Sequence, residues 1–274
     1  MRKLRMENGS NVTINDELER IVSFSPAVTE TLFDLGLGDK IIADSAFCAR
    51  PEAAKSKRKL ASYSTTRIDV LEELNPDIIL TIGGYQEMLY NKINKKFKTY
   101  MFELPSSMFG ILDMINKIGI VVNRKNEAKR LVESLSKNIK NNSKKIKTYF
   151  EIDLGGPITF GSMSYITDAL YFLGFESIYL EKDSEWLYPD FDFVRSQDPD
   201  VIIYEHKMYR DFNYDDIKRI IDERNWNNIS AVKKGNVFIT PGKLDFFAHH
   251  GPSFFREVLP WADSKYHESL KNII

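Results

Sequence analysis

The sequence has little of what usually marks a specialised class of protein. It contains one cysteine, Cys48, so no disulfide can form within the chain. Its formal net charge of −1 gives no reason to expect nucleic acid or an anionic membrane as a partner. Uninterrupted apolar runs reach only about five residues, whereas a transmembrane helix needs about twenty. The 274 residues, 43% apolar and 28% charged, therefore suit a soluble globular protein of one large α/β domain or two lobes.

Common catalytic motifs are also missing. The sequence has no GxxxxGK[ST], GxGxxG, GxSxG or HExxH. Cys48 could serve as a nucleophile, but no basic partner is identifiable near it, which favours a small buried residue. We expect no enzymatic activity.

The N-terminus, MRKLRMENGSNVTIND, has the basic start of a signal peptide but no apolar segment behind it. Two alternatives follow. The chain is cytoplasmic, or its numbering starts after a removed export segment.

Two motifs occur twice, in the same order. TETLFDLGLGDKI (29–41) resembles TDALYFLGFESIY (167–179), and NPDIILTIGG (75–84) resembles DPDVIIYEHK (198–207). In each half, helical spacing alternates with short β-rich runs, which predicts β-α-β-α-β order and two α/β lobes with mainly parallel sheets. The expected strands are 21–24, 41–43, 78–81, 201–204 and 237–240, and the expected helices of the first half are 29–37 and 68–74.

Between the repeats, helical spacing of apolar residues predicts one uninterrupted helix over 126–147. At about 1.5 Å per residue it would be roughly 30 Å long, the width of a small lobe. We therefore expect an N-terminal lobe over 1–125, a stiff bridging helix over 126–147 and a C-terminal lobe over 148–274.

Two lobes joined side by side form a cleft, which the loops at the carboxyl ends of the strands line. Ser25 and Pro26 follow the first strand, Phe47 the second and Tyr85 the third. In the second half, GKLDFFAHHGPSFF (242–255) follows the last clear strand and holds two of the four histidines. These loops are expected to form a ligand-binding site.

Several stretches together resemble a known family. They are IVSFSPAVTETLFDLGLGDKIIA, the NPDIIL strand, YFEIDLGGPITFGS, DPDVIIY and GPSFFREVLPWA. In this order they are similar to class III solute-binding proteins of ABC importers, a family with cobalamin-, haem- and siderophore-binding members. The resemblance runs from about Arg20 to Ala262 and implies two Rossmann-like lobes, one long bridging helix and a ligand in the interlobe cleft.

The resemblance also implies roles for individual residues. In cobalamin-binding members, an aromatic residue and an acid precede the Pro-Asp strand in each lobe. These positions fall on Tyr63 and Asp69, and 123 positions later on Trp186 and Asp192. The two aromatics would contact the ligand. The two acids would face outward and pair with arginines of the membrane permease, with help from Glu72 and Glu73.

A late family motif, Asp-aromatic-aromatic-x-Arg, falls on Asp245, Phe246, Phe247 and His249, with histidine in place of arginine. His249 or His250 would be a possible axial contact to a metal carried by the ligand, and no metal site made by the protein alone is expected. The complete set of expected ligand-binding residues is Ser25, Pro26, Phe47, Tyr63, Tyr85, Trp186, Asp245, Phe246, Phe247, His249 and His250.

Simpler structural roles remain open for these residues. Isolated aromatics are often core or surface anchors, and a histidine pair can belong to a hydrogen-bonded loop. Asp69 and Asp192 can be first-turn helix acids, stabilised by the helix dipole by about 0.3–1 kcal/mol.

The sequence thus predicts a monomeric, extracytoplasmic receptor that delivers cobalamin to an ABC permease and has no intrinsic cofactor. Haem or a ferric siderophore is the alternative ligand. A cytoplasmic cofactor-handling protein or enzyme on the same scaffold is the alternative class.

Overall fold

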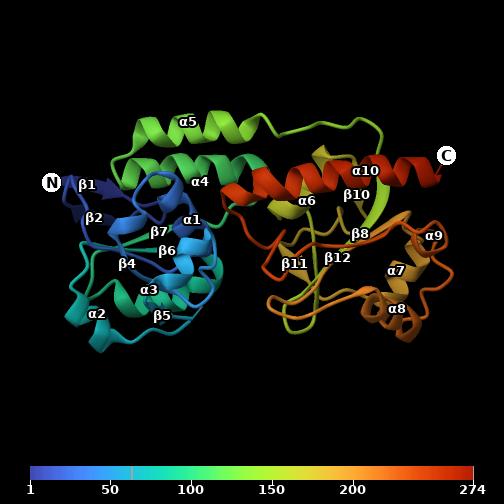
Figure 1. Ribbon diagram of the computed structural model, residues 1–274, viewed down its shortest axis with the longest axis horizontal. Helices are drawn as coiled ribbons and strands as arrows, with labels where there is room; N and C mark the ends of the chain where they lie inside the picture. Colours follow the sequence, from blue (N-terminus) through green and yellow to red (C-terminus); the bar gives the residue numbers. More distant parts are fainter. Residues whose placement is uncertain (63, 274) are drawn as a thin grey trace. The chain divides into compact units, whose positions relative to one another are not determined.

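A computed structural model describes residues 1–62 and 64–273 (Figure 1). The chain divides into two compact units. The first unit contains Met1–Pro105 and Ile111–Lys137, and the second contains Ser106–Gly110 and Asn138–Ile274. Each unit has its own central sheet, so each is described separately.

The first unit is built on a parallel five-stranded sheet. Its strands are β3 (Ile21–Ser23), β4 (Ile41–Ser45), β5 (Lys59–Ala61), β6 (Ile78–Ile82) and β7 (Thr99–Phe102). Their order is β5-β4-β3-β6-β7, and every neighbouring pair is parallel. The chain order reverses between β3 and β6. In α/β sheets, loops diverge at such a switch point and leave room for a ligand.

Helices cover both faces of this sheet. They are α1 (Pro26–Asp34), α2 (Ile68–Leu74), α3 (Glu87–Ile93), α4 (Met108–Val121) and α5 (Lys125–Ser136), with short 3₁₀ helices η1 (Gly38–Lys40), η2 (Glu52–Ser56) and η3 (Gly84–Gln86). Because side chains alternate along a strand, Ile78 and Leu80 of β6 pack with α1 and α4, whereas Ile79 packs with α2 and α3. A hairpin of β1 (Arg2–Arg5) and β2 (Asn11–Ile14) adds Val12 and Ile14 to the first of these clusters.

The second unit has a mixed sheet. Its strands are β8 (Ile146–Asp153), β9 (Pro157–Phe160), β10 (Phe175–Ser177), β11 (Trp186–Leu187), β12 (Val201–Glu205) and β13 (Val237–Ile239). β8 is parallel to β10 and β12, and β12 is parallel to β13. β9 and β11 extend the sheet in antiparallel pairs. The parallel part agrees with the expected fold class.

The helices of the second unit are α6 (Tyr165–Phe172), α7 (Phe191–Gln197), α8 (Tyr214–Glu223), α9 (Ser230–Lys233), a π-helical turn η4 (Phe254–Val258) and α10 (Leu259–Ile273). Trp226 anchors one core cluster, with its ring edge-on to Tyr149 at 5.5 Å and to Phe191 at 5.6 Å. Within residues 1–62 and 64–273, no helix combines the length and apolar character needed to cross a membrane.

The internal repeat is confirmed. Helix α7 and strand β12 begin and end 123 positions after α2 and β6, respectively. The residues that end the two helices, Asn75 and Asp198, both adopt the left-handed conformation, with φ of 41° and 45°. Asn and Asp tolerate this conformation better than most residues, so the same turn leads into both strands.

The predicted helix over 126–147 is wrong. Helix α5 ends at Ser136, and Ile146 opens strand β8. The segment between them, KNIKNNSKK, is rich in Asn and Ser, whose side chains compete with helical hydrogen bonds. Asn142 illustrates this, since its Nδ2 donates to the carbonyl oxygen of Leu173 at 3.0 Å and to Asp263 at 2.9 Å.

The long apolar helix of this region is α4, which begins at Met108 in the second unit and continues from Ile111 in the first. It contains Gly119, where α5 approaches closely. A Cβ atom at Gly119 would lie 2.3 Å from the Cβ of Ala128 and 2.9 Å from the carbonyl oxygen of Arg124. The glycine is therefore required by helix packing.

Gly119→Ala is expected to lower the free energy of unfolding by about 1–3 kcal/mol, because the added methyl group overpacks the helix pair. Helix propensity alone predicts the opposite, a gain of about 1 kcal/mol. The double variant Gly119→Ala/Ala128→Gly should lose less than the sum of the single losses, because it removes one clashing methyl group. Urea denaturation measures all three variants, and an unchanged stability of Gly119→Ala would contradict the close packing.

Candidate functional site

The loop after β3 is built around the start of α1. Ser25 is fully buried, and its Oγ accepts a hydrogen bond from the backbone N–H of Val28 at 3.5 Å. Pro26 occupies the first helical position, where its missing N–H costs nothing. The Ser25 hydroxyl therefore serves the helix, and a contact from it to a ligand stays a prediction.

Gln86 joins the two loops at the switch point of the first sheet. Its Nε2 donates to the carbonyl oxygen of Phe24 at 2.9 Å, and its Oε1 accepts from the backbone N–H of Ile82 at 3.1 Å. Gln86 is fully buried, whereas the preceding Tyr85 is 40% exposed. The buried amide thus holds a loop that presents an aromatic side chain.

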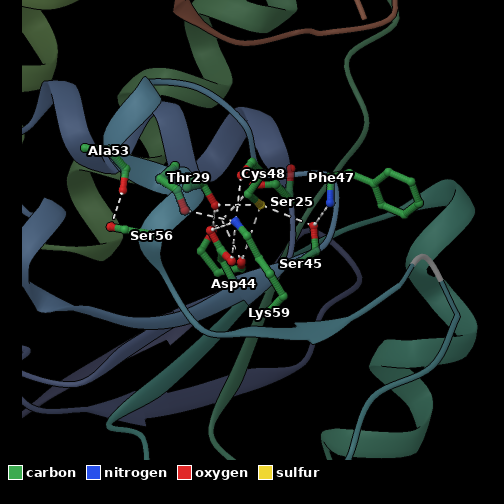
Figure 2. A network of polar contacts seen from close by, with 11 residues as sticks. Ser25, Thr29, Asp44, Ser45, Phe47, Cys48, Ala53, Ser56 and Lys59 are labelled. Carbon is green, nitrogen blue, oxygen red and sulfur yellow. Dashed lines mark hydrogen bonds and ion pairs between the residues drawn. The ribbon is translucent and has the colours of Figure 1, made fainter. Parts of the chain in front are cut away.

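Lys59 organises the loop after β4. Its Nζ donates to Oδ2 of Asp44 at 2.9 Å and to the carbonyl oxygens of Cys48 at 2.8 Å and Ala54 at 2.9 Å (Figure 2). An ammonium group has three N–H donors, so this side chain is saturated. Lys59 links the end of β4, the following loop and η2.

Phe47 lies on this loop, and Figure 2 shows its side chain extending away from the polar network. Its backbone N–H donates to Oγ of Ser45 at 3.3 Å, and its side chain is half-buried. The next residue, Cys48, is buried, with its Sγ 3.2 Å from the hydroxyls of Thr29 and Ser45. Burial raises the pKa of the Cys48 thiol, so the prediction of a small buried residue is confirmed.

Asp69 and Asp192 occupy the second position of α2 and α7. Both carboxylates are exposed, at 62% and 81%, and each pairs with a nearby arginine: Asp69 with Arg67 at 2.6 Å and Asp192 with Arg195 at 2.8 Å. The hydrogen bond from Arg67 lowers the pKa of Asp69. The predicted ligand-contacting residue Tyr63 lies outside the described residues.

Trp186 presents an aromatic face on the second unit. It pairs through its backbone with Phe160 of β9, and its carbonyl oxygen accepts from Oγ of Ser184 at 2.7 Å. Its side chain is 49% exposed, and the ring of Tyr188, 72% exposed, stands edge-on to it at 5.8 Å. The two neighbouring rings form a continuous exposed apolar surface, and such surfaces often mark binding sites.

A buried carboxylate holds the 245–248 loop. Glu205, at the end of β12, accepts hydrogen bonds from the backbone N–H groups of Phe246 at 2.9 Å, Phe247 at 2.6 Å and Ala248 at 3.4 Å. Burial, followed by the nearby charge of Asp245, raises the pKa of Glu205 to about 8, and the three backbone hydrogen bonds oppose this rise. Asp245 itself is half-buried.

Phe246 and Phe247 point into the second unit. Their rings stand edge-on to Trp261, at 5.5 Å and 6.0 Å, and Phe247 also packs on Phe150 at 4.8 Å. They are 5% and 0% exposed. Their observed role is to anchor the loop, and direct contact with a ligand stays a prediction.

Both histidines of this stretch are buried, at 5% and 4% exposure. The ring of His250 lies 5.7 Å from Tyr165, and its Nε2 has no hydrogen-bond partner among the described residues. Burial lowers the pKa of His250 to about 3, so the ring is neutral. Over the part of the chain that the structure describes, no three His, Cys, Asp or Glu side chains gather as a metal site.

Three polar residues that fix these loops were not singled out from the sequence: Lys59, Gln86 and Glu205. One sequence signal exists for Glu205, because a charged residue ends the apolar run VIIY. A polar side chain at the buried end of a strand needs hydrogen-bond partners, and here the partners are backbone amides 41 to 43 positions away.

The pKa of Asp44 leads to a test of the Phe47 loop. Burial raises it from 3.8 to about 6, against the opposing contact with Lys59. The pKa of Asp44 is higher in the folded protein than in the unfolded chain. The stability that this shift contributes to the fold is therefore complete below pH about 4 and is lost as pH rises through about 6. The stability of the wild type relative to Asp44→Asn should therefore fall by on the order of 2 kcal/mol between pH about 4 and about 7.5.

Chemical denaturation over this pH range measures the difference. Asp39→Asn, which removes an exposed carboxylate from η1, is the control and should show no such dependence. A pH-independent difference between the wild type and Asp44→Asn would contradict the raised pKa.

Comparison with known proteins agrees with this architecture. The Vitamin B12-binding protein of Vibrio vulnificus is 28% identical over 171 residues, covering 59% of this chain. The match spans 62% of that relative's length, less than two thirds.

Two solved structures share the fold. The haem-binding protein RhuT from Roseiflexus superposes with a TM-score of 0.76 at 16% identity, over 92% of this chain and 99% of RhuT. A protein of an Fe³⁺-hydroxamate transport system from Saccharomonospora viridis superposes with a TM-score of 0.75 at 20% identity, over 97% and 98% of the two chains. The periplasmic binding protein family matches residues 21–244, which include both sheets, and the chain belongs to this family.

Proposed function

We propose that this protein is the substrate-binding receptor of an ABC importer and that it carries cobalamin or a related corrinoid. The exposed pair of Trp186 and Tyr188 is the observation that carries the proposal. A corrin offers a wide apolar face, which suits stacking on such rings. The Vitamin B12-binding relative supports this ligand.

The same proposal assigns roles to the first unit. Phe47 and Tyr85 lie on loops fixed by Lys59 and Gln86, respectively, so their side chains are presented with little loss of conformational entropy on binding. In the second unit, half-buried Asp245 would accept hydrogen bonds from the amide-bearing edge of a corrinoid. Phe246 and Phe247 would support this loop from the interior.

Haem or a ferric siderophore is the second candidate ligand. The observation that favours it is His249, which stands where the resemblance expects arginine and adds an imidazole to the loop. The structural similarity to the haem-binding protein RhuT and to the protein of the Fe³⁺-hydroxamate transport system also supports haem or a ferric siderophore as the alternative ligand. We propose an extracytoplasmic location for either ligand.

Titration with cyanocobalamin, haemin and a ferric siderophore panel tests the ligand, because their absorption spectra differ. We expect the corrinoid to bind tightest and Trp186→Ala to weaken it by about 2–4 kcal/mol, about 30- to 800-fold. Tyr214→Ala, which removes an exposed aromatic at the start of α8, is the matched control and should bind normally. Unchanged affinity in folded Trp186→Ala would remove the basis for this site.

Docking to a permease gives a separate test. Asp69→Lys with Asp192→Lys should leave ligand affinity unchanged but reduce uptake, because like charges at an interface cost several kcal/mol. Asp215→Lys is the control, since Asp215 is also an exposed acid at the second position of a helix, α8. Uptake that is normal in the double variant, or equally reduced in the control, would contradict the docking role.

A further inference from the structure

A pocket of about 260 Å³ lies within the second unit, on the face of the sheet that α8 covers. Its walls come from the ends of β8 and β12, the turn before β9, the loop after β12 and α8. Pockets that bind drug-sized ligands measure about 300–1,000 Å³. This pocket therefore suits a smaller molecule than a tetrapyrrole.

The floor of the pocket is a buried ion pair. Arg224 donates to both carboxylate oxygens of Glu151, at 2.7 Å and 2.9 Å, and Tyr149 donates a further hydrogen bond. The guanidinium carbon lies 3.9 Å from the Phe191 ring and 4.8 Å from the Trp226 ring. A buried pair is weak evidence for stability, since apolar residues of equal volume often stabilise as well or better. Here it gives the pocket a rigid polar base.

Two of the carboxylates that line the pocket, Asp153 and Asp216, already have partners within the protein. Oδ1 of Asp153 accepts from the backbone N–H of Gly155 at 2.8 Å. Asp216 belongs to the capping box of α8, accepts from the backbone N–H of Asn213 at 3.0 Å and pairs with Arg219. These acceptors have limited capacity left for a ligand.

The hydrogen-bond donors have capacity left. Arg210 lies 3.6 Å from Asp153, too far for a good hydrogen bond, and its guanidinium donates none within the described residues. Tyr204 also lines the pocket, and its hydroxyl has no hydrogen bond in residues 1–62 and 64–273. Burial raises the pKa of Tyr204, so the hydroxyl keeps its proton. A guanidinium fork and a phenol together suit a carboxylate.

The charged side chains that line the pocket argue against a simple anion as its ligand. Four carboxylates face three guanidinium groups, and Glu223 at the rim has no ion pair or hydrogen bond from its side chain among the described residues. An anion alone would be repelled by the acids, and a cation alone by the arginines. A molecule with one carboxylate and one ammonium group complements both.

We propose that this pocket is a binding site for a small zwitterion, of which an α-amino acid is the simplest case. The carboxylate binds Arg210 and Tyr204, and the ammonium group binds the acidic rim at Glu223. A pocket of about 260 Å³ has room for an amino acid with a short side chain. The site is separate from the proposed corrinoid contacts and does not rest on them.

Calorimetric titration of the full chain tests the proposal, with L-alanine and L-serine as zwitterions, succinate as a dianion and putrescine as a dication. We expect at least one amino acid to bind with a Kd below about 1 mM, and both other probes to bind at least about 10-fold more weakly. Arg210→Gln should weaken amino-acid binding at least about 10-fold, and Tyr204→Phe about 5-fold.

Arg195→Gln is the matched control, because its side chain is 48% exposed, against 47% for Arg210, and it lies outside the pocket. It should bind amino acids like the wild type. Absence of amino-acid binding at about 10 mM, tighter binding of succinate or putrescine, or undiminished binding by Arg210→Gln would overturn the proposal. Corrinoid titration of the same preparation reports separately on the receptor function.

Discussion

The buried carboxyl group of Glu205 determines the shape of the late loop in the second unit. Glu205 ends β12 and must find hydrogen-bond donors nearby, because an unpaired buried polar group is costly. It finds them in three successive backbone amides, and this requirement orders residues 246–248. Phe246 and Phe247 can then pack inward on Trp261, while half-buried Asp245 remains at the edge. In the first unit, Lys59 and Gln86 play the same part for the loops of Phe47 and Tyr85.

Local patterns predicted much of the fold. The segment IDVLEEL and the run after Pro76 became α2 and β6, and their repeats became α7 and β12, because the periodicity and the turn before each strand lie within a few residues. The prediction of a bridging helix over 126–147 failed for a physical reason. Apolar spacing continued through Ile139 to Ile146, but tertiary hydrogen bonds from Asn142 and strand pairing at Ile146 outweighed it. Helix α4 was not predicted. It contains Gly119, a residue with low helix propensity, and only the partner helix α5 shows why a small residue is needed there.

The candidate site was less predictable than the fold. The interpretation of Asp69 and Asp192 as acids in the first turns of helices is correct, whereas no strand was predicted at Trp186, which lies in β11. Spacing did not separate side chains that face solvent from those that support a loop. Phe247 and Trp186 are both large aromatics near strand ends, yet one is fully buried and the other is half exposed. The difference comes from partners distant in sequence, such as Phe150 and Trp261 for Phe247, which no local pattern contains.

The second unit therefore combines two surfaces with different physical requirements. Around Trp186 and Tyr188, binding would come from apolar area and would change little with salt, since no charge is involved. In the pocket under α8, binding would come from charge pairing with Arg210 and Glu223, above a floor formed by the ion pair of Arg224 and Glu151. Because the side chain of Arg210 is 47% exposed and Glu223 is exposed, both groups would lose hydration on binding, which keeps the expected affinity low. A low-affinity, chemically selective site is thus compatible with the same sheet that supports a large apolar surface.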